Sequence, residues 1–265
     1  MAAGTVSTVR EYEAFAPFYD AFTADSDYEV WTGHVVELAT RLGLGGTTLL
    51  DVACGTGKSF LPFLNRGFDV TGCDISTAML AQAARKAPGV VLVEADVREL
   101  PRIGSFELVT CFDDSLNYLL EERDLARALG SIARNLSPSG LALFDLNTLL
   151  AYRTTFAVDS VIARDGAVFA WRGEASGEVA PGSRAEAVMD IFAPRADALY
   201  ERIRVRHSQR HFPPDRVTAL LEGAGLECLG VHGVQADGRL EPDLDETRHL
   251  KVLFATRRSK GGDRP

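Results

Sequence analysis

The chain has 265 residues, of which 46% are hydrophobic and 25% charged, and it carries a formal net charge of −9 at pH 7. These values are typical of globular proteins, and an acidic chain is a poor partner for the phosphate backbone of nucleic acids. The sequence contains neither 18 uninterrupted apolar residues nor the apolar core of a signal peptide, so we expect no membrane partner and a cytoplasmic location.

From residue 47 onward, short apolar runs alternate with segments of helical length. Strands are predicted at 47–53, 68–74, 90–96, 105–112 and 140–147, and helices at 58–67, 76–87 and 122–136. The last helix has the clearest pattern, because apolar side chains recur along it at the spacing of one helical face. Such an alternation is typical of a parallel sheet covered by helices on both faces.

The pattern changes after residue 148. Between 150 and 211, stretches such as "AVFAWRGEA" and "ALYERIRVRH" alternate apolar and polar residues, which predicts about four short antiparallel strands. A helix at 213–225 and strands at 226–233 and 249–257 follow. The predicted fold class is therefore α/β, with a doubly wound, mostly parallel, seven-stranded Rossmann-like sheet and a small antiparallel β insertion after the fifth strand.

The stretch "LLDVACGTG" at 49–57 places two glycines directly after the first strand, where an open α/β sheet binds its ligands. Gly55 and Gly57 allow the backbone to turn tightly or to approach a ligand closely. The spacing fits neither a P-loop nor the dinucleotide fingerprint, in which Phe60 takes the place of the third glycine. Asp51, at the end of the strand, would repel a pyrophosphate and attract a ligand with an ammonium group.

Two further carboxylates follow at the ends of the next strands. Asp74 closes the second strand, where it can accept hydrogen bonds from a ribose diol, and Asp96 closes the third, where it can meet the exocyclic amine of adenine. Met79 can lie against the adenine ring, although it can equally be a core residue. A cationic amino acid, a ribose and an adenine in this order describe S-adenosylmethionine.

"LLDVACGTG", "VTGCDISTAML" and "VLVEADVRELP" together resemble the first three motifs of the class I S-adenosylmethionine-dependent methyltransferases. The resemblance covers most of the chain, about residues 12–147 and 211–257, and is strongest to members that act on small molecules. A lone pair of glycines would mean little, but the ordered set of glycine turn, ribose acid and adenine acid is specific to this family.

The resemblance implies S-adenosyl-L-methionine as the cofactor. Asp51 and the two glycines would contact its methionine end, Asp74 its ribose hydroxyls, and Asp96 with Val97 its adenine edge. The implied cofactor contacts are Tyr19, Asp51, Ala53, Cys54, Gly55, Gly57, Asp74, Ile75, Met79, Asp96, Val97 and Phe112.

Tyr12, Phe18 and Tyr19, in "EYEAFAPFYDAF", resemble the N-terminal aromatic lid of small-molecule members of the family. The resemblance implies that a tyrosine hydroxyl bonds the carboxylate of the cofactor, and we assign this role to Tyr19. The alternative is that the tyrosines are surface aromatics of a short helix.

The segment "CFDDSLNYL" at 111–119 follows the fourth strand, where family members place acceptor contacts. The residues implied to face the acceptor are Asp113, Ser115, Asn117 and Tyr118. Candidates for a catalytic base are Asp114, His211 and His232. Of the two adjacent aspartates at most one is expected to point into the site, and a structural role is the alternative for both histidines.

No metal site is predicted. The spacing of His207 and His211 is compatible with metal binding, but no third ligand is evident nearby. The four cysteines form no CxxC pair, which argues against a zinc site or a disulfide framework and fits a reducing compartment.

The sequence divides into four parts under this interpretation. Residues 1–148 hold the lid and the cofactor-binding part, 149–211 an insertion on the acceptor side or at a dimer interface, 212–257 the completion of the α/β domain, and 258–265 a flexible tail. Strand edges in the insertion could pair across a two-fold axis, so a homodimer is one of the expectations.

The resemblance implies transfer of a methyl group to an amine or hydroxyl of a small molecule. The NPPY-like run of enzymes that methylate DNA or glutamine amides is absent after the fourth strand. The "SLNYL" segment and the β insertion resemble N-methyltransferases of nucleotide-linked amino sugars, so such an intermediate of natural-product metabolism is the predicted acceptor. The alternatives are a non-catalytic protein that binds the same cofactor and a NAD-dependent oxidoreductase.

Overall fold

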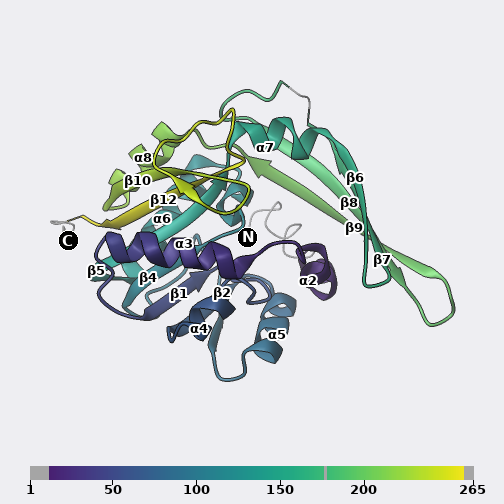
Figure 1. Cartoon of the computed structure of the whole chain (residues 1–265), viewed down its shortest axis with the longest axis horizontal. Helices are drawn as coiled ribbons and strands as arrows, with labels where there is room; N and C mark the ends of the chain where they lie inside the picture. Colours follow the sequence, from purple (N-terminus) through teal and green to yellow (C-terminus); the bar gives the residue numbers. More distant parts are fainter. Residues whose placement is uncertain (1–11, 176–177, 260–265) are drawn as a thin grey trace.

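The structure is a computed structural model that describes residues 12–175 and 178–259. Its centre is an eight-stranded sheet with the strand order β11-β10-β12-β5-β4-β1-β2-β3 (Figure 1). The strands are β1 (Thr48–Val52), β2 (Asp69–Asp74), β3 (Val91–Glu94), β4 (Phe106–Cys111), β5 (Leu136–Asn147), β10 (Leu226–Val234), β11 (Leu240–Glu241) and β12 (Lys251–Arg258).

Strands β1 to β5 run parallel to one another, and β12 runs antiparallel between β5 and β10. The predicted mostly parallel sheet is therefore confirmed. The eighth strand, β11, has two residues that pair with the end of β10, and it is too short to leave a periodic signal in the sequence. The strand order reverses between β1 and β4, and ligands of open α/β sheets bind outside the carboxyl ends of strands at such a point.

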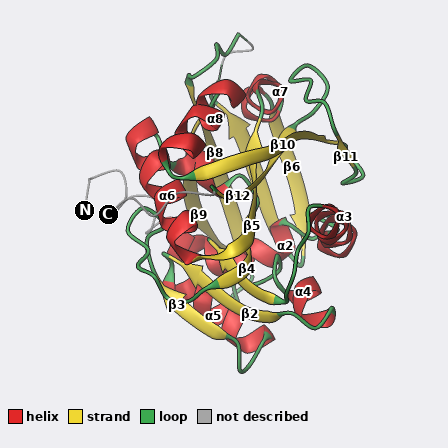
Figure 2. Cartoon of the chain, turned by 90° about the vertical axis from the view of Figure 1, so that its left-hand side faces the viewer, coloured by secondary structure: helices red, strands yellow, loops and turns green. Residues whose placement is uncertain are grey.

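Helices cover both faces of the sheet (Figure 2). Leu49 and Leu50 of β1 show why, because these neighbouring side chains enter two different core clusters. One cluster packs against α6 and α8 and the other against α3, α4 and α5. The helices of the domain are α3 (Tyr28–Arg41), α4 (Leu61–Asn65), α5 (Thr77–Lys86), α6 (Glu122–Asn135) and α8 (Pro214–Gly223).

The helix expected at 58–67 is shorter than predicted. Residues 58–60 continue the turn that begins at the glycines, and α4 starts at Leu61, one residue before Pro62. Gly67 ends the segment with a φ of +82°, a conformation that glycine adopts without strain. None of the described helices is long and apolar enough to span a membrane.

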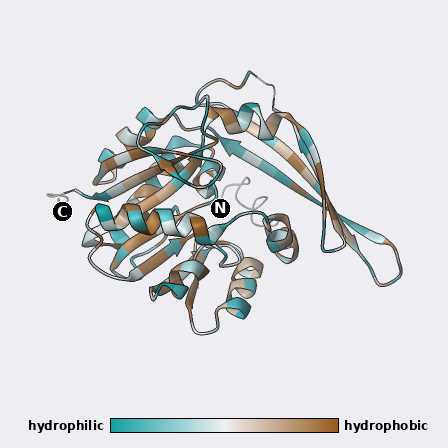
Figure 3. Cartoon of the chain, viewed as in Figure 1, coloured by the Kyte–Doolittle hydropathy of each residue, from teal (hydrophilic) through white to brown (hydrophobic). Residues whose placement is uncertain are grey.

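The insertion contains the predicted four antiparallel strands, in the order β6-β7-β8-β9. It consists of α7 (Leu149–Arg153), η3 (Thr155–Ala157), β6 (Asp159–Arg164), β7 (Ala167–Gly173), β8 (Arg184–Pro194) and β9 (Tyr200–Arg210). The last two strands have 11 residues each and are longer than expected, and they carry one end of the sheet beyond the α/β domain (Figure 1). Hydrophobic and hydrophilic residues are interspersed along them (Figure 3).

A short N-terminal segment lies between the α/β domain and the insertion sheet (Figure 1). It includes η1 (Ala16–Phe18) and α2 (Tyr19–Phe22). Phe15 and Ala16 are buried in one cluster with Met79 of α5 and Phe169 of β7. This segment therefore connects helix α5 of the α/β domain with the insertion sheet through a shared apolar core.

Candidate functional site

The turn after β1 has an unusual backbone. Ala53, Gly55 and Gly57 have φ angles of +55°, +53° and +85°, and only glycine adopts such values without strain. A Cβ atom on Gly57 would lie 2.6 Å from the ring of Phe60, so position 57 has no room for a side chain. Cys54 offers only its backbone here, because its side chain is buried in the core.

Asp51 is buried at the end of β1. Its carboxylate accepts hydrogen bonds from Ser59 Oγ at 2.5 Å and from Thr110 Oγ1 at 2.6 Å. Burial raises the pKa of Asp51 to about 7 in spite of these two bonds. A ligand cation beside it would compensate the buried charge, so the site suits an ammonium group.

Asp74 joins the end of β2 to the glycine turn. It accepts hydrogen bonds from the backbone N–H groups of Gly55 and Ser76, each at 2.8 Å. Burial raises its pKa, although backbone bonds from Ser76, Gly55 and Ile75 oppose the shift. We call Asp51, Asp74 and residues 53–57 the glycine-turn cluster.

The predicted adenine contacts have other partners in this structure. Asp96 accepts hydrogen bonds from the backbone N–H and the guanidinium of Arg98, which outweigh the effect of burial and lower its pKa. Val97 packs against the core, and Met79 is buried beneath the N-terminal segment and the insertion sheet. Their roles at the adenine stay predictions.

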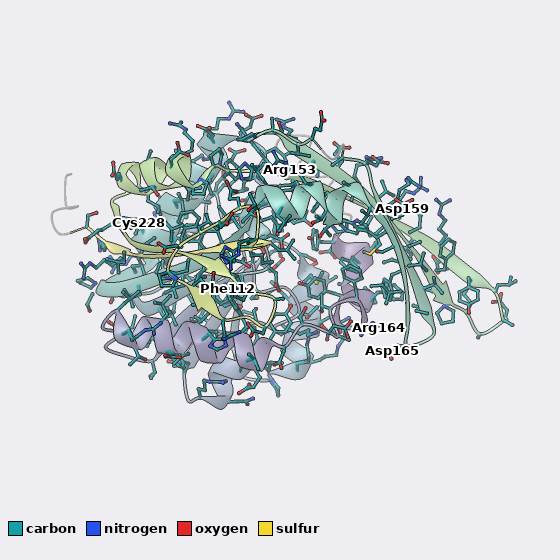
Figure 4. The ribbon with its side chains drawn as sticks, turned by 45° about the horizontal axis from the view of Figure 1, so that its top comes forward. Phe112, Arg153, Asp159, Arg164, Asp165 and Cys228 are labelled. Atoms are coloured by element: carbon teal, nitrogen blue, oxygen red, sulfur yellow. The ribbon has the colours of Figure 1, made fainter. Side chains whose placement is uncertain are left out.

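Polar contacts hold the N-terminal segment over the glycine turn. Glu13 accepts hydrogen bonds from Ser76 Oγ at 2.8 Å and from the N–H of Ala78 at 3.2 Å, at the start of α5. Asp20 accepts one from Thr56 Oγ1 at 2.5 Å. At its far end Asp25 pairs with Arg164, which Figure 4 shows at the end of β6.

The two adjacent aspartates after β4 both have a left-handed backbone conformation, with φ angles of +58° at Asp113 and +50° at Asp114. Non-glycine residues rarely adopt this conformation, and strained backbone of this kind is concentrated at functional sites. Asp113 Oδ2 accepts hydrogen bonds from Tyr28 Oη at 2.6 Å and from Tyr19 Oη at 3.5 Å. The predicted lid tyrosine thus points at Asp113.

Lys251 is the centre of the acidic group. Its Nζ atom donates to Asp114 Oδ1 at 2.9 Å and to Asp145 Oδ2 at 2.8 Å, and it lies 3.9 Å from Asp113 Oδ1. Gln209, on the insertion sheet, donates to the other oxygen of Asp114 at 2.6 Å. We call these five residues the lysine cluster.

The charges of this cluster shift the pKa values of its members. Burial alone would lower the pKa of Lys251, but the surrounding carboxylates outweigh it and hold this pKa well above its ordinary value. Burial raises the pKa of Asp145 to about 6, although Lys251 opposes the shift. The three carboxylates outnumber the single ammonium group, so the cluster attracts cations.

Two other residues expected to face the acceptor, Ser115 and Asn117, instead form hydrogen bonds within the protein. Ser115 Oγ donates to the carbonyl of Phe112 at 2.8 Å. Asn117 is fully buried, where its amide donates to the carbonyl of Arg210 at 2.8 Å and accepts from the N–H of Asn147 at 2.9 Å. Both residues therefore fasten the segment after β4 in place.

Two aromatic residues of the same segment differ in their surroundings. The ring of Phe112 is buried edge-on against Trp31 of α3, with 5.4 Å between the centroids, in the middle of the domain (Figure 4). Tyr118 instead points to the insertion sheet, where its Oη atom lies 2.7 Å from His207 Nδ1.

The two histidines proposed as bases, His211 and His232, do not belong to the lysine cluster. Both ring nitrogens of the buried His211 have partners, Glu246 at 2.8 Å and the N–H of Gly182 at 3.1 Å. Burial lowers the pKa of His232, and the charge of Arg41, in the last turn of α3, adds to this effect. In the sheet His232 pairs with Leu253 of β12, which pairs in turn with Asp145 of β5, and the His232 ring lies beside Gly230, in the direction away from Val234, the partner of Lys251.

Sequence reasoning missed Lys251, Asp145, Gln209 and Tyr28. Two of them left a signal, because "GLALFDLN" places a carboxylate inside a strand that is otherwise apolar and "KVLFA" begins an apolar strand with a lysine. Gln209 and Tyr28 left none. Among the described residues, no group of three histidine, cysteine or acidic side chains is placed to hold a metal ion.

Comparison with known proteins connects this geometry to one class of enzyme. A family model described as "Methyltransferase domain" matches residues 49–140. The chain is 30% identical over 258 residues to the Bacillus subtilis (strain 168) protein named "Putative methyltransferase YqeM", which covers 94% of this chain and 98% of that protein.

Two further similarities are of different extent. The dTDP-3-amino-3,4,6-trideoxy-alpha-D-glucopyranose N,N-dimethyltransferase of Streptomyces venezuelae is 30% identical over 132 residues, 49% of this chain and 56% of that enzyme. A crystal structure of an S-adenosylmethionine-dependent methyltransferase from Clostridium acetobutylicum ATCC 824 shares the fold, with a TM-score of 0.77 and 23% identity over 94% of this chain and 99% of that one.

Proposed function

The chain belongs to the class I S-adenosylmethionine-dependent methyltransferases, and on that premise we propose that it methylates an amine nitrogen of a small molecule, with Asp113 taking the proton of the acceptor's ammonium group. The proposed acceptor class is a nucleotide-linked amino sugar. The cofactor is S-adenosyl-L-methionine, which supplies a methyl group on a positively charged sulfur.

The glycine-turn cluster suits this cofactor. Asp51 is a buried carboxylate whose hydrogen bonds come from two hydroxyl groups, and no cationic side chain of residues 12–175 and 178–259 offsets its raised pKa; we assign it to the ammonium group of the methionine end. Asp74 accepts backbone hydrogen bonds from Gly55, Ser76 and Ile75, and a carboxylate has about four acceptor positions, so it keeps capacity to accept a ribose hydroxyl.

The exposure of Asp113 carries the proposal. Its side chain is 38% exposed, against 21% for Asp114 and 3% for Asp145. Asp113 Oδ1 lies 3.9 Å from Lys251 Nζ, which is beyond hydrogen-bond distance. Asp114, one of the three residues that the sequence suggested as a base, is instead bonded at both oxygens. Asp113 is therefore the carboxylate of the cluster that can meet a ligand.

An amine attacks a methyl group through its lone pair, so the ammonium form must first lose a proton. A positioned carboxylate that receives this proton contributes typically 10²–10⁴-fold to the rate. Tyr28 and Tyr19 fix the orientation of Asp113 through its Oδ2 atom and leave Oδ1 toward the acceptor. The remaining requirement is alignment of nitrogen, methyl carbon and sulfur, which is a matter of positioning.

The similarity to the Streptomyces venezuelae enzyme supports the choice of an amino sugar, since the name of that enzyme contains one. This similarity covers about half of the chain. The acidic surplus of the lysine cluster supports an amine independently, because an ammonium group is attracted there and a neutral alcohol is not.

The direct test is an assay for S-adenosylhomocysteine formation with three acceptors. The first is the sugar named for that relative, which we call the 4-deoxy acceptor, the second is its analogue with a hydroxyl at C4, the 4-hydroxy acceptor, and the third is dTDP-glucose, which has no amine. We expect methylation of the two amines. Transfer to dTDP-glucose, or to none of the three, contradicts the proposal.

The role of Asp113 is tested with Asp113→Asn. At pH 7 we expect kcat to fall about 100-fold and to recover at a pH above the pKa of the acceptor amine, where no proton has to be removed. The matched control is Asp165→Asn, because Asp165 also has a left-handed backbone conformation and lies in the turn after β6 (Figure 4). A loss of the same size at high pH would mean that Asp113 does not accept the proton.

A further inference from the structure

His207 carries a buried nitrogen without a hydrogen-bond partner. It lies on β9, two residues before Gln209, and the residue is 4% exposed. Nδ1 is hydrogen-bonded to Tyr118, whereas Nε2 has no partner among the described residues. A buried polar group left unpaired costs free energy, so a partner that arrives with a ligand is a reasonable origin for this feature.

The hydrogen bond with Tyr118 indicates which nitrogen of His207 holds the proton. Tyr118 Oη and His207 Nδ1 are 2.7 Å apart, and because a phenol O–H is a stronger donor than an imidazole N–H and an unprotonated imidazole nitrogen a stronger acceptor than a phenol oxygen, Tyr118 donates and Nδ1 accepts. Burial lowers the pKa of His207 to about 4, so the ring is neutral. A neutral ring whose Nδ1 accepts a hydrogen bond has its proton on Nε2.

This N–H group has aromatic surroundings. The rings of Tyr12, Phe15 and Trp171 surround His207, with centroids 6.4, 6.2 and 5.0 Å from its own. The indole N–H of Trp171 is used by the carbonyl of Thr155. A charged oxygen would be buried here without a counter-charge, so an uncharged hydroxyl or carbonyl oxygen suits the position better than a carboxylate or a phosphate.

The same group is near the proposed reaction centre. Gln209 bonds both Tyr118 and Asp114 Oδ2, so two side chains separate the His207 ring from the aspartates after β4. The N-terminal segment supplies Tyr12 to His207 and Tyr19 to Asp113. A ligand atom at His207 Nε2 and a ligand amine at Asp113 would thus be covered by one segment.

We propose that His207 Nε2–H donates a hydrogen bond to a hydroxyl oxygen of the methyl acceptor, next to the amine that is methylated, and that His207 thereby selects acceptors that carry this hydroxyl. The inference rests on the proposed function. Tyr118 is a positioning residue in this arrangement, because its hydrogen bond keeps the proton of His207 on Nε2.

The test compares kcat/KM for the 4-hydroxy and the 4-deoxy acceptor in three proteins. The wild type should prefer the 4-hydroxy acceptor. His207→Phe keeps the ring and removes the donor, and it should lower kcat/KM for the 4-hydroxy acceptor by about 10- to 100-fold and for the 4-deoxy acceptor less than threefold. His207→Gln places an amide N–H near the position of Nε2 and should restore most of the preference.

Two outcomes would overturn the inference alone. Equal effects of His207→Phe on both acceptors would show that the hydroxyl is not its partner. A parallel fall in the affinity for S-adenosylhomocysteine would show that the oxygen belongs to the cofactor. If the wild type methylates neither acceptor, the proposed acceptor class is wrong as well.

A measurement on the unmutated protein guards against a variant that fails to fold. Nitrogen-15 NMR of histidine-labelled protein should show a neutral His207 with its proton on Nε2 at pH 7, and Tyr118→Phe should disturb this tautomer. A proton on Nδ1 in the wild type would overturn the inference without any assay.

Discussion

The glycine-turn cluster and the lysine cluster both place carboxylates at the carboxyl ends of parallel strands, but they are held by very different stretches of chain. Asp51 is bonded by Ser59, 8 residues away, and by Thr110, 59 residues away, and Asp74 is bonded by Gly55, 19 residues away. In the lysine cluster, Asp114 is bonded by Gln209, 95 residues away, and by Lys251, 137 residues away.

The two clusters therefore depend on different parts of the chain. The glycine-turn cluster needs the neighbouring parallel strands β1, β2 and β4 and the turns after them, so changes there should act on the affinity for the cofactor. The lysine cluster exists only when the insertion, β5 and β12 are assembled, so changes there should act on stability and on the choice of acceptor. A variant in one cluster that behaves like a variant in the other would break the comparison.

The largest expected effect is on cofactor affinity in Asp74→Ala. The change leaves the N–H groups of Gly55 and Ser76 without their acceptor and removes the proposed ribose contact, and each lost charge-assisted bond costs about 1.5–3 kcal/mol. Calorimetry should show S-adenosylhomocysteine binding weakened about 100-fold or more. The control is Asp69→Ala, at the exposed start of the same strand. An Asp74→Ala affinity within threefold of the wild type would contradict the assignment.

The corresponding change in the lysine cluster is Lys251→Met. It leaves three neighbouring carboxylates without their cation, and since Lys251 is partly exposed we expect the lower end of the range for broken buried pairs, about 3 kcal/mol of unfolding free energy. Urea unfolding measures it, and the affinity for S-adenosylhomocysteine should stay within threefold.

Arg239→Met is the control for this change, because the Arg239–Asp237 pair is exposed and should matter by less than about 0.5 kcal/mol. Adding Asp145→Asn to Lys251→Met should recover part of the loss, since one uncompensated charge is then removed. Similar stabilities of Lys251→Met and Arg239→Met would show that the cluster does not depend on its cation.

Two glycines with nearly the same backbone sharpen the comparison within the cofactor part. Gly57 and Gly67 have φ angles of +85° and +82°, but only at Gly57 would a Cβ atom meet a side chain, the ring of Phe60 at 2.6 Å. Gly67→Ala should cost ~1 kcal/mol of stability through its backbone. Gly57→Ala should cost ~1–3 kcal/mol more, through the clash, and weaken cofactor binding. Equal losses would mean that Phe60 moves aside freely.

The raised pKa of Asp51 predicts a pH dependence of cofactor binding. Its folded pKa of about 7 lies above the ordinary value of 3.8, so the stability from its protonated form is present below about pH 4 and lost as the pH rises through 7. A bound ammonium group favours the carboxylate, so affinity should rise up to about 10-fold between pH 6 and pH 8. Asp51→Asn should remove this rise, and a flat profile in the wild type would contradict the assignment.

The same difference in sequence separation explains what the sequence could predict. The parallel sheet, the insertion and the acidic residues at the strand ends follow from short periodic patterns. Asp51 and Asp74 could therefore be placed at the ends of their strands, beside the glycine turn, from the sequence. Gln209 left no local signal, and the lysine that begins the apolar strand at 251 is a signal that does not tell which residue it reaches, so neither contact with Asp114 could be predicted. His207 was considered only for its spacing to His211, since a sequence shows a residue type and not the face toward which it points.

The smallest expected effect is that of replacing His232, because the sequence alone could not show toward which face its side chain points. His232 is half-buried on β10, and its ring lies beside Gly230, whereas Lys251 pairs with Val234 in the other direction along the strand. His232→Gln should therefore leave kcat within twofold and stability within about 0.5 kcal/mol, in contrast to Asp113→Asn. A fall of kcat by a factor of ten or more in a folded His232→Gln would place the end of β10 in the reaction and would require the acceptor to extend away from the insertion sheet. The unchanged kcat that we expect would confine the acceptor to the side where Asp113, Gln209 and His207 meet.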